Sequence, residues 1–392
     1  MPRRGLLLAG FLVASSSCKK EATVPPEIPP PAAADATSPN HGGGSDDDDE
    51  FADDTPQTKT KVGFGSPKLD AITLAKRPDW TDKYAYSAPD QRRFKISKVM
   101  ADYGLARDAA VEVQNLYRDL AVADPDANLD GLLAKAVSRV NQGEYEDRRD
   151  TERLAKAKFI VVFDLDSTLY DQHVPESIGE RCHDIKLQAE GKTRYIKLVP
   201  GWDETIKRIN ALGGAVVLFT ANTDERSWDN GRVWMLDGKP IVDSPLVAGF
   251  LTNSHLVQQS KDEGTPVQEP SKDLRIFDES LSRAIIVDDN PERLIQPANT
   301  RVFKKFNAES ACTTEDPKVR KAYERALPAV LAEIEASVAY MDKAGVSFAE
   351  AYRPYTAMGQ VAVVWAMGAL GLSEKKAIEW VRAHPTQVDP SF

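Results

Sequence analysis

The sequence predicts an α/β protein, in which helices cover both faces of a doubly wound parallel β-sheet. Three short and nearly continuous apolar runs, KFIVVFDL, GAVVLFTAN and RAIIVDDN, each end in polar residues. Such runs are typical of parallel strands that are buried on both faces. WDETIKRINALGG lies between the first two runs, has apolar residues at helical spacing and ends in a Gly pair. Strand, helix and strand in this order favour a doubly wound sheet, with helical segments before and after it.

The 392 residues, 42% of them hydrophobic, suffice for one large core or for a core with accessory helices. The net charge of −10 disfavours a general nucleic-acid binder, so no nucleic-acid partner is expected. Changes in composition predict five segments. They are a signal segment (1–18), a linker (19–57), a helical lead-in (58–157), the α/β domain (158–310) and a C-terminal helical region (311–392).

The N-terminal segment MPRRGLLLAGFLVASSSCKK has two Arg, then an apolar stretch from Gly5 to Ala14, then small residues and Cys18. This is the plan of a secretory signal peptide. It resembles a bacterial lipoprotein signal, in which the Cys is lipidated, although Ser15 stands where Leu is usual. We therefore expect a protein of the bacterial cell envelope, periplasmic or outer-membrane, that is anchored to the membrane through a lipid on Cys18. The alternative is an ordinary signal peptide with a chance Cys.

The linker 19–57 contains Pro clusters, a Gly run and four consecutive Asp. It has almost no apolar surface to bury, so we expect it to be disordered. Residues 58–157 change to a helical texture, because apolar residues recur at helical intervals over 109–120 and again over 129–140. This lead-in offers no catalytic pattern.

The C-terminal region contains a long helical pattern over 317–341 and an uncharged segment over 355–372. The uncharged segment raises the possibility of a membrane span, but its Gln, Thr and Gly residues favour a buried packing helix. Gly371 is expected to close this helix, and Ser373 to cap the next one.

The chain has three Cys, and no two of them have the spacing of metal ligands. We expect Cys182 and Cys312 to be buried free thiols. If the chain is exported to an oxidising compartment, they could instead form a disulfide.

Polar side chains follow each of the three predicted strands. Asp164 and Asp166 follow the first strand, Thr220 the second, and Asp288 and Asp289 the third. Ligands of an open parallel sheet bind beyond the carboxyl ends of the strands. Four carboxylates crowded there would repel each other, and a divalent cation with oxygen ligands, Mg²⁺, would relieve this repulsion.

The segments FDLDSTL, FTAN, a Lys and IIVDD, in this order, resemble the four motifs of the haloacid dehalogenase (HAD) superfamily of aspartate-nucleophile phosphatases. KDLRIFDESLSRAIIVDDNPERLIQPANTRVFKKF resembles the end of the catalytic domain in FCP/SCP-like phosphatases, also called NLI-interacting-factor-like, and LVPGWDETI resembles their RPG segment. The resemblance covers about 157–310. It departs from the family at Val199, where the RPG segment has Arg, and in the longer region 170–200, so specificity for phosphoproteins stays open.

The resemblance implies a HAD-like Rossmannoid fold and a Mg²⁺-dependent phosphatase. Asp164 would attack phosphorus and form an aspartyl-phosphate. Asp166 would protonate the leaving oxygen and later deprotonate the attacking water. Lys272, in the KDL match, would supply positive charge to the phosphoryl group and to Asp164. Thr168 would brace the turn rather than contact substrate.

The predicted phosphate-binding groups are Thr220 and Lys272, together with Ala221 and Asn222. The predicted metal ligands are Asp164, Asp166, Asp288 and Asp289; by resemblance Asp289 is the direct ligand and Asp288 acts through water. Residues 223–270 separate the second and third motifs. This insertion contains four polar or aromatic candidates, Arg226, Trp228, Arg232 and Trp234. These side chains either shape the substrate pocket or belong to a small helix that covers the core.

The leading hypothesis is therefore a phosphomonoesterase whose partner is a phosphorylated protein or small molecule. One alternative is a non-catalytic binding module with the same fold, but the presence of both Asp164 and Asp166 disfavours it. Another is an enzyme of the same fold with a nucleotide or sugar phosphate as its substrate, or with a different reaction. Asp166 disfavours a dehalogenase, whose leaving group needs no proton.

Overall fold

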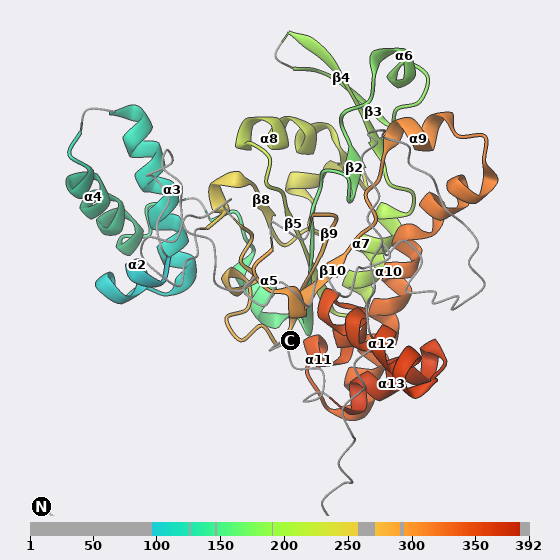
Figure 1. The fold of residues 1–392 in the computed structure, drawn as a ribbon. Helices are drawn as coiled ribbons and strands as arrows, with labels where there is room; N and C mark the ends of the chain where they lie inside the picture. Colours follow the sequence, from blue (N-terminus) through green and yellow to red (C-terminus); the bar gives the residue numbers. More distant parts are fainter. Residues whose placement is uncertain are drawn as a thin grey trace, which may run out of the picture. The chain divides into compact units, whose positions relative to one another are not determined.

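A parallel five-stranded sheet forms the centre of the fold in the computed structural model (Figure 1). Its order is β10-β9-β1-β5-β8, and all four pairings are parallel. The strands are β1 (Phe159–Phe163), β5 (Gly214–Phe219), β8 (Phe250–Leu251), β9 (Ala284–Asp288) and β10 (Thr300–Val302). The three predicted strands are the three central ones, and the α/β fold class is confirmed.

The structure describes residues 96–124, 127–145, 147–189, 191–257, 271–290 and 294–384, which all fall within one unit of the chain, Thr58–Phe392. Cys18 and the predicted signal segment and linker lie outside these residues.

Helices cover both faces of the sheet. Phe159, Val161 and Phe163 pack in one core with α7 (Trp202–Ala211) and α10 (Pro317–Ala344). The alternate residues Ile160 and Val162 pack in a second core with the N-terminal helices. These are α2 (Ile96–Tyr103), α3 (Arg107–Ala123), α4 (Leu129–Asn141) and α5 (Thr151–Lys156). Burial on both faces explains why the strand is apolar without alternation.

The predicted helices of the lead-in are confirmed as α3 and α4, and α3 packs against the segment after β8. Gln114 Nε2 donates to the backbone oxygen of Leu256 at 2.9 Å, and Glu112 Oε1 lies 4.0 Å from His255 Nε2. Burial lowers the pKa of His255 to about 3 and raises that of Glu112 to about 7. Both side chains are therefore neutral at mildly acidic pH.

A second, antiparallel sheet of order β2-β4-β3 lies between β1 and α7 in the sequence and was not predicted. Its elements are β2 (Tyr170–Asp171), β3 (Ile185–Ala189) and β4 (Lys192–Leu198), with α6 (Glu176–Gly179) between β2 and β3. We call this segment, 170–198, the cap. Its two longer strands mix exposed, half-buried and buried side chains, so they lack the continuous apolar run that revealed the central strands.

The insertion after β5 forms α8 (Asp224–Val233) and a short hairpin of β6 (Met235–Leu236) and β7 (Lys239–Pro240). Trp234 is buried in the core, and the ring of Trp228 packs on Phe250. Of the two interpretations of this insertion, the structure contains the helix that covers the core. Single 3₁₀ turns complete the described domain at Ile241–Asp243, Asn253–His255, Leu274–Ile276, Pro297–Asn299 and Arg353–Tyr355.

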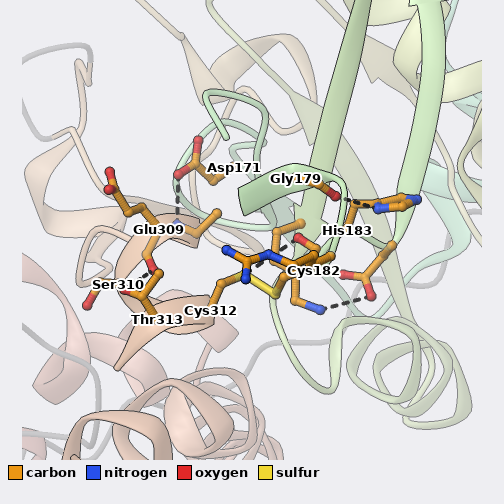
Figure 2. Close-up of a disulfide and its surroundings, with 12 residues drawn as sticks. Asp171, Gly179, Cys182, His183, Glu309, Ser310, Cys312 and Thr313 are labelled. Carbon is orange, nitrogen blue, oxygen red and sulfur yellow. Dashed lines mark hydrogen bonds and ion pairs between the residues drawn. A yellow bond between two sulfur atoms is a disulfide. The ribbon is translucent and has the colours of Figure 1, made fainter. Parts of the chain in front are cut away.

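A disulfide joins Cys182, just after α6, to Cys312 in α9 (Ala308–Thr313) (Figure 2). The prediction of two buried free thiols is therefore wrong, and both residues are in fact half-buried. The two Cys are 130 residues apart in sequence, but the fold brings their Cα atoms to 6.0 Å, a distance that a disulfide spans. Asp171 Oδ2 also accepts from the backbone N–H of Ala308 at 2.8 Å, so two links tie the cap to α9.

The C-terminal region is helical, as predicted. It contains α10, α11 (Phe348–Tyr352), α12 (Ala357–Leu370) and α13 (Glu374–Ala383). Gly371, with φ +62°, closes α12; Ser373 stands at the start of α13, but its side chain makes no capping hydrogen bond. Among the residues that the structure describes, no helix has the length and apolar character needed to cross a membrane. The predicted buried helix is buried on one face only: α12 packs on α13 through Val363 and Ala366, whereas its side chains Val364, Trp365 and Leu370 are exposed.

A buried ion pair fastens α10 to the sheet. Arg301 in β10 donates from Nε and Nη2 to the two carboxylate oxygens of Glu333, at 3.1 and 2.9 Å. Tyr352 O–H donates to the same carboxylate at 3.0 Å. Such a bidentate pair fixes both partners in one geometry.

Candidate active site

The carboxyl ends of the parallel strands gather the predicted residues at one edge of the sheet. Asp164 directly follows β1, and its backbone N–H donates to Val287 O of β9 at 2.9 Å. Thr220 directly follows β5, and its N–H donates to Leu251 O of β8 at 3.0 Å. These bonds continue the ladders past the strand ends and fix the backbone of both residues.

One cavity of about 210 Å³ contains all the predicted catalytic, phosphate-binding and metal-binding positions. The predicted residues that line it are Asp164, Asp166, Thr220, Ala221, Asn222, Lys272, Asp288 and Asp289. Ser167 and Asn290 also line it and were not singled out in the sequence, although each is next to a motif Asp. None of the four candidates from the insertion, Arg226, Trp228, Arg232 and Trp234, lines this cavity.

Three carboxylates are placed to share a cation. Asp164, Asp288 and Asp289 each offer one oxygen, and these oxygens lie within 4.8 Å of one another. Oxygen-only donor sets of this kind fit Mg²⁺. The side chain of Asp166, the fourth predicted ligand, lies outside this group and is engaged elsewhere.

Lys272 is fully buried and lies between two of these carboxylates. Its Nζ contacts Asp164 Oδ1 and donates to Asp288 Oδ2 at 2.7 Å. Burial by itself would lower the pKa of Lys272, but the two carboxylates outweigh that effect and raise it. Lys272 therefore stays charged and balances part of the acidic cluster.

The carboxylate of Asp166 is held at both oxygens. Thr220 Oγ1 donates to Oδ2 at 3.0 Å, Asn222 Nδ2 approaches Oδ2 at 3.5 Å, and Gln172 Nε2 donates to Oδ1. The backbone N–H of Asn222 in turn donates to Thr220 Oγ1 at 3.0 Å. The cap residue Gln172 is a contact that the sequence analysis missed, because a lone Gln forms no recognisable motif.

Thr168 joins the first motif to the last. Its hydroxyl accepts from the backbone N–H of Asp289 at 3.1 Å and lies 3.3 Å from Asp289 Oδ1. Ser167 turns the chain in the left-handed region, at φ +62°, and its carbonyl accepts from Phe306 N at 2.7 Å. Thr168 thus braces the turn without lining the cavity, as expected.

Burial raises the pKa values of Asp164, Asp166 and Asp289. Burial raises the pKa of Asp164 well above its usual range, aided by Asp288 and opposed by Lys272. Burial also raises the pKa of Asp166, against the hydrogen bonds from Gln172 and Thr220. Burial and then Asp288 raise the pKa of Asp289 to about 6.

A family model described as NLI interacting factor-like phosphatase matches residues 159–324. No curated protein matches the chain.

Two similar solved structures are of the RNA polymerase II CTD phosphatase Fcp1. One is a fission yeast variant bound to beryllium fluoride, with 15% identity over 57% of this chain and 69% of that chain, at a TM-score of 0.30. The other is Fcp1 described as an essential enzyme, with 17% identity over 60% of this chain and 65% of that chain, also at a TM-score of 0.30. The chain thus spans about two thirds of their length.

The matched residues 159–324 contain the sheet edge, the cavity and all four motifs. This part of the chain is therefore similar to the family described as NLI interacting factor-like phosphatases.

Proposed function

We propose that this domain hydrolyses phosphomonoesters with Mg²⁺, through an aspartyl-phosphate formed on Asp164. The observation that carries the proposal is the position of Asp164. It lies at the end of the central strand, lines the cavity, and is flanked by Lys272 and by the acidic pair Asp288 and Asp289. Few structural roles require so many buried charges at one point of a fold.

The donor set fits the cation that the proposal requires. Asp164, Asp288 and Asp289 would hold it, because three hard oxygen donors within 4.8 Å of one another repel without a counter-charge. When bound, Mg²⁺ would supply positive charge that lets a dianionic phosphoryl group approach a carboxylate. Lys272, whose Nζ contacts both Asp164 and Asp288, adds a fixed positive charge.

The chemistry then divides between two Asp. A carboxylate oxygen of Asp164 attacks phosphorus, an oxygen–phosphorus bond forms, and the bond to the leaving oxygen breaks as Asp166 donates its proton. Water next attacks the phosphoryl group, Asp166 takes the proton from that water, and inorganic phosphate leaves Asp164. Thr220 donates to Asp166 Oδ2 and so fixes this carboxylate in the cavity that Asp164 also lines.

The decisive assay is hydrolysis of p-nitrophenyl phosphate. Asp164→Asn should abolish turnover because an amide does not attack phosphorus. Asp166→Asn should lower kcat by roughly 10²–10⁴-fold, because the water that hydrolyses the aspartyl-phosphate loses its general base. EDTA should abolish activity and added Mg²⁺ should restore it. Asp130→Asn, at an exposed position of α4, is the matched control and should behave as wild type.

Equal activity in the wild type, both active-site variants and the EDTA-treated enzyme would refute the proposal. A second probe is beryllium fluoride, which is bound in one of the Fcp1 structures. It should inhibit this enzyme by occupying the phosphoryl position on Asp164, and only when Mg²⁺ is present.

We further propose a phosphorylated protein side chain as the substrate. A cavity of about 210 Å³ is smaller than the roughly 300–1,000 Å³ of typical small-molecule sites. It holds a phosphoryl group and the first atoms of its leaving group, while the rest of the substrate stays outside. A panel of phosphopeptides, nucleotides and sugar phosphates tests this, and the highest kcat/KM on a nucleotide or sugar phosphate would refute it.

We also propose that the chain is a lipid-anchored protein of the bacterial envelope. The support is the Arg-led apolar segment before Cys18, together with the disulfide Cys182–Cys312, since disulfides persist in oxidising compartments. Mass spectrometry of the mature N-terminus tests the proposal. A retained Met1 or an unmodified Cys18 would overturn it.

A further inference from the structure

A chain of side-chain hydrogen bonds runs from the cap to Asp166. Arg194 Nη1, on β4, donates to Asn230 Oδ1 of α8 at 2.9 Å. Asn230 Nδ2 donates to Gln172 Oε1 at 3.1 Å, and Gln172 Nε2 donates to Asp166 Oδ1. Three separate segments of the fold thus meet in one line that ends at the proposed proton-transfer group.

The middle of this chain is shielded from water. The exposed fraction of Asn230 is 1% and that of Gln172 is 7%. Asn230 Nδ2 also lies 3.3 Å from the hydroxyl oxygen of Tyr170, which is itself buried. Buried amides without partners are costly, so each link is held in place by the cost of breaking it.

The two ends fix the direction of every bond. A guanidinium can only donate, so Arg194 requires the oxygen of Asn230 and turns the Asn230 amide nitrogen toward Gln172. Gln172 must then accept with its oxygen, which turns its own amide nitrogen toward Asp166. Asp166 Oδ1 accepts from this nitrogen, both when the carboxyl group is ionised and when its proton is on Oδ2, so the orientation is consistent at both ends. Neither amide can flip without breaking two bonds.

We propose that Gln172 is a positioning residue for the phosphatase reaction, oriented by Asn230 and Arg194 so that its amide holds the Asp166 carboxylate in the line of proton transfer. Gln172 holds Oδ1, while Thr220 holds Oδ2 from the sheet side. The cap thereby completes the proton-transfer geometry. This inference rests on the proposed role of Asp166.

The test compares two substrates with different needs for a proton. The p-nitrophenolate ion leaves readily without protonation, whereas the more basic phenolate of phenyl phosphate needs it. Because kcat/KM reports the steps up to the first irreversible one, it isolates departure of the leaving group. Gln172→Met removes the amide at nearly constant volume. It should lower kcat/KM for phenyl phosphate by about 10- to 100-fold, as expected for a misplaced catalytic group, and spare p-nitrophenyl phosphate.

Matched variants separate positioning from general damage. The control variant Gln188→Met makes the same substitution on β3 of the cap, where the Gln188 side chain donates to Thr193 Oγ1 at 2.8 Å. It should leave the rates for both substrates unchanged. Arg194→Met should shift the substrate ratio in the same direction as Gln172→Met, but less. Arg194→Lys, which still donates, should restore the ratio.

The outcomes distinguish failure of the positioning role of Gln172 from failure of the proposed mechanism. If Asp166→Asn shows the substrate dependence and Gln172→Met lowers both substrates equally or neither, the positioning role is overturned while the proposed mechanism stands. If Asp166→Asn itself shows no substrate dependence, the mechanism fails first. Should Gln172→Met not fold, the pair Arg194→Met and Arg194→Lys decides, and an unchanged substrate ratio in both overturns the inference.

Discussion

The disulfide between Cys182 and Cys312 should make a large contribution to stability. Replacing both residues by Ser removes a cross-link between positions 130 apart in sequence. The loss of loop-closure entropy in the unfolded chain gives roughly 5 kcal/mol for a loop of this length, and measured values are commonly about 2–4 kcal/mol. At about 2 °C per kcal/mol for a large domain, the melting temperature should fall by roughly 5–10 °C.

Thermal and urea unfolding of the oxidised wild type, the reduced wild type and the double variant measure this effect. Reduced wild type and Cys182→Ser/Cys312→Ser should unfold together, below the oxidised protein. Since neither Cys lines the cavity, the folded variant should keep its phosphatase activity well below the melting temperature. Equal melting temperatures for the oxidised wild type and the double variant would refute the entropy argument.

Three further predictions concern stability, and urea unfolding measures each. Arg301→Met should cost about 3–5 kcal/mol because it leaves Glu333 buried and unpaired, and adding Glu333→Leu should recover most of that loss. The pKa of His255 is about 3 in the folded protein against about 6.5 for an unperturbed imidazole, so the unfolded chain binds the proton first. His255 should therefore contribute a loss of stability of up to about 5 kcal/mol as the pH drops from 6.5 toward 3, against the opposite contribution of carboxyls with raised pKa values such as Glu112, and the His255→Gln variant should lack this loss. Gly359→Ala should destabilise α12, because a Cβ at position 359 would clash with the backbone oxygen of Arg353 in the preceding turn. The control variant is Gly368→Ala in the same helix. A Cβ at position 368 meets no atom within 4 Å, so this variant should stabilise α12 by up to about 1 kcal/mol.

Each of these has a result that would contradict it. A double variant at Arg301 and Glu333 as unstable as the single variant would show that the pair is not the cause. Identical acid profiles for wild type and His255→Gln would exclude that residue as the source of the pH dependence. Equal midpoints for the two Gly variants would rule out the steric argument.

The sequence predicted the central strands and the site on them for one physical reason. A strand buried on both faces must be apolar throughout, so its polar end at Asp164, Thr220 or Asp288 stands out. The same reasoning fails for β8 and β10, which are two and three residues long and carry too little pattern to recognise.

The cap and its contacts could not be predicted from the sequence, for a different reason. Its strands are half-exposed and rich in charge, so they resemble loops. The pairing of Cys182 with Cys312 and the contact of Gln172 with Asp166 depend on segments that only the folded chain brings together. No local spacing signals either.

The order of strands in the sheet also bears on how fast the protein acquires its activity. β1 pairs with β5 and β9, so Phe159 lies beside Gly214 and Ile160 beside Ala284, partners far apart in the sequence. Contacts between distant segments are slow to form, because the chain loses loop-closure entropy before these contacts contribute favourable free energy. Helices such as α3 and α10 can form early from local contacts, but Asp164 meets Asp288 only when β9 has docked. After dilution from denaturant, catalytic turnover should therefore recover later than helical circular dichroism, and it reports the docking of the central strands.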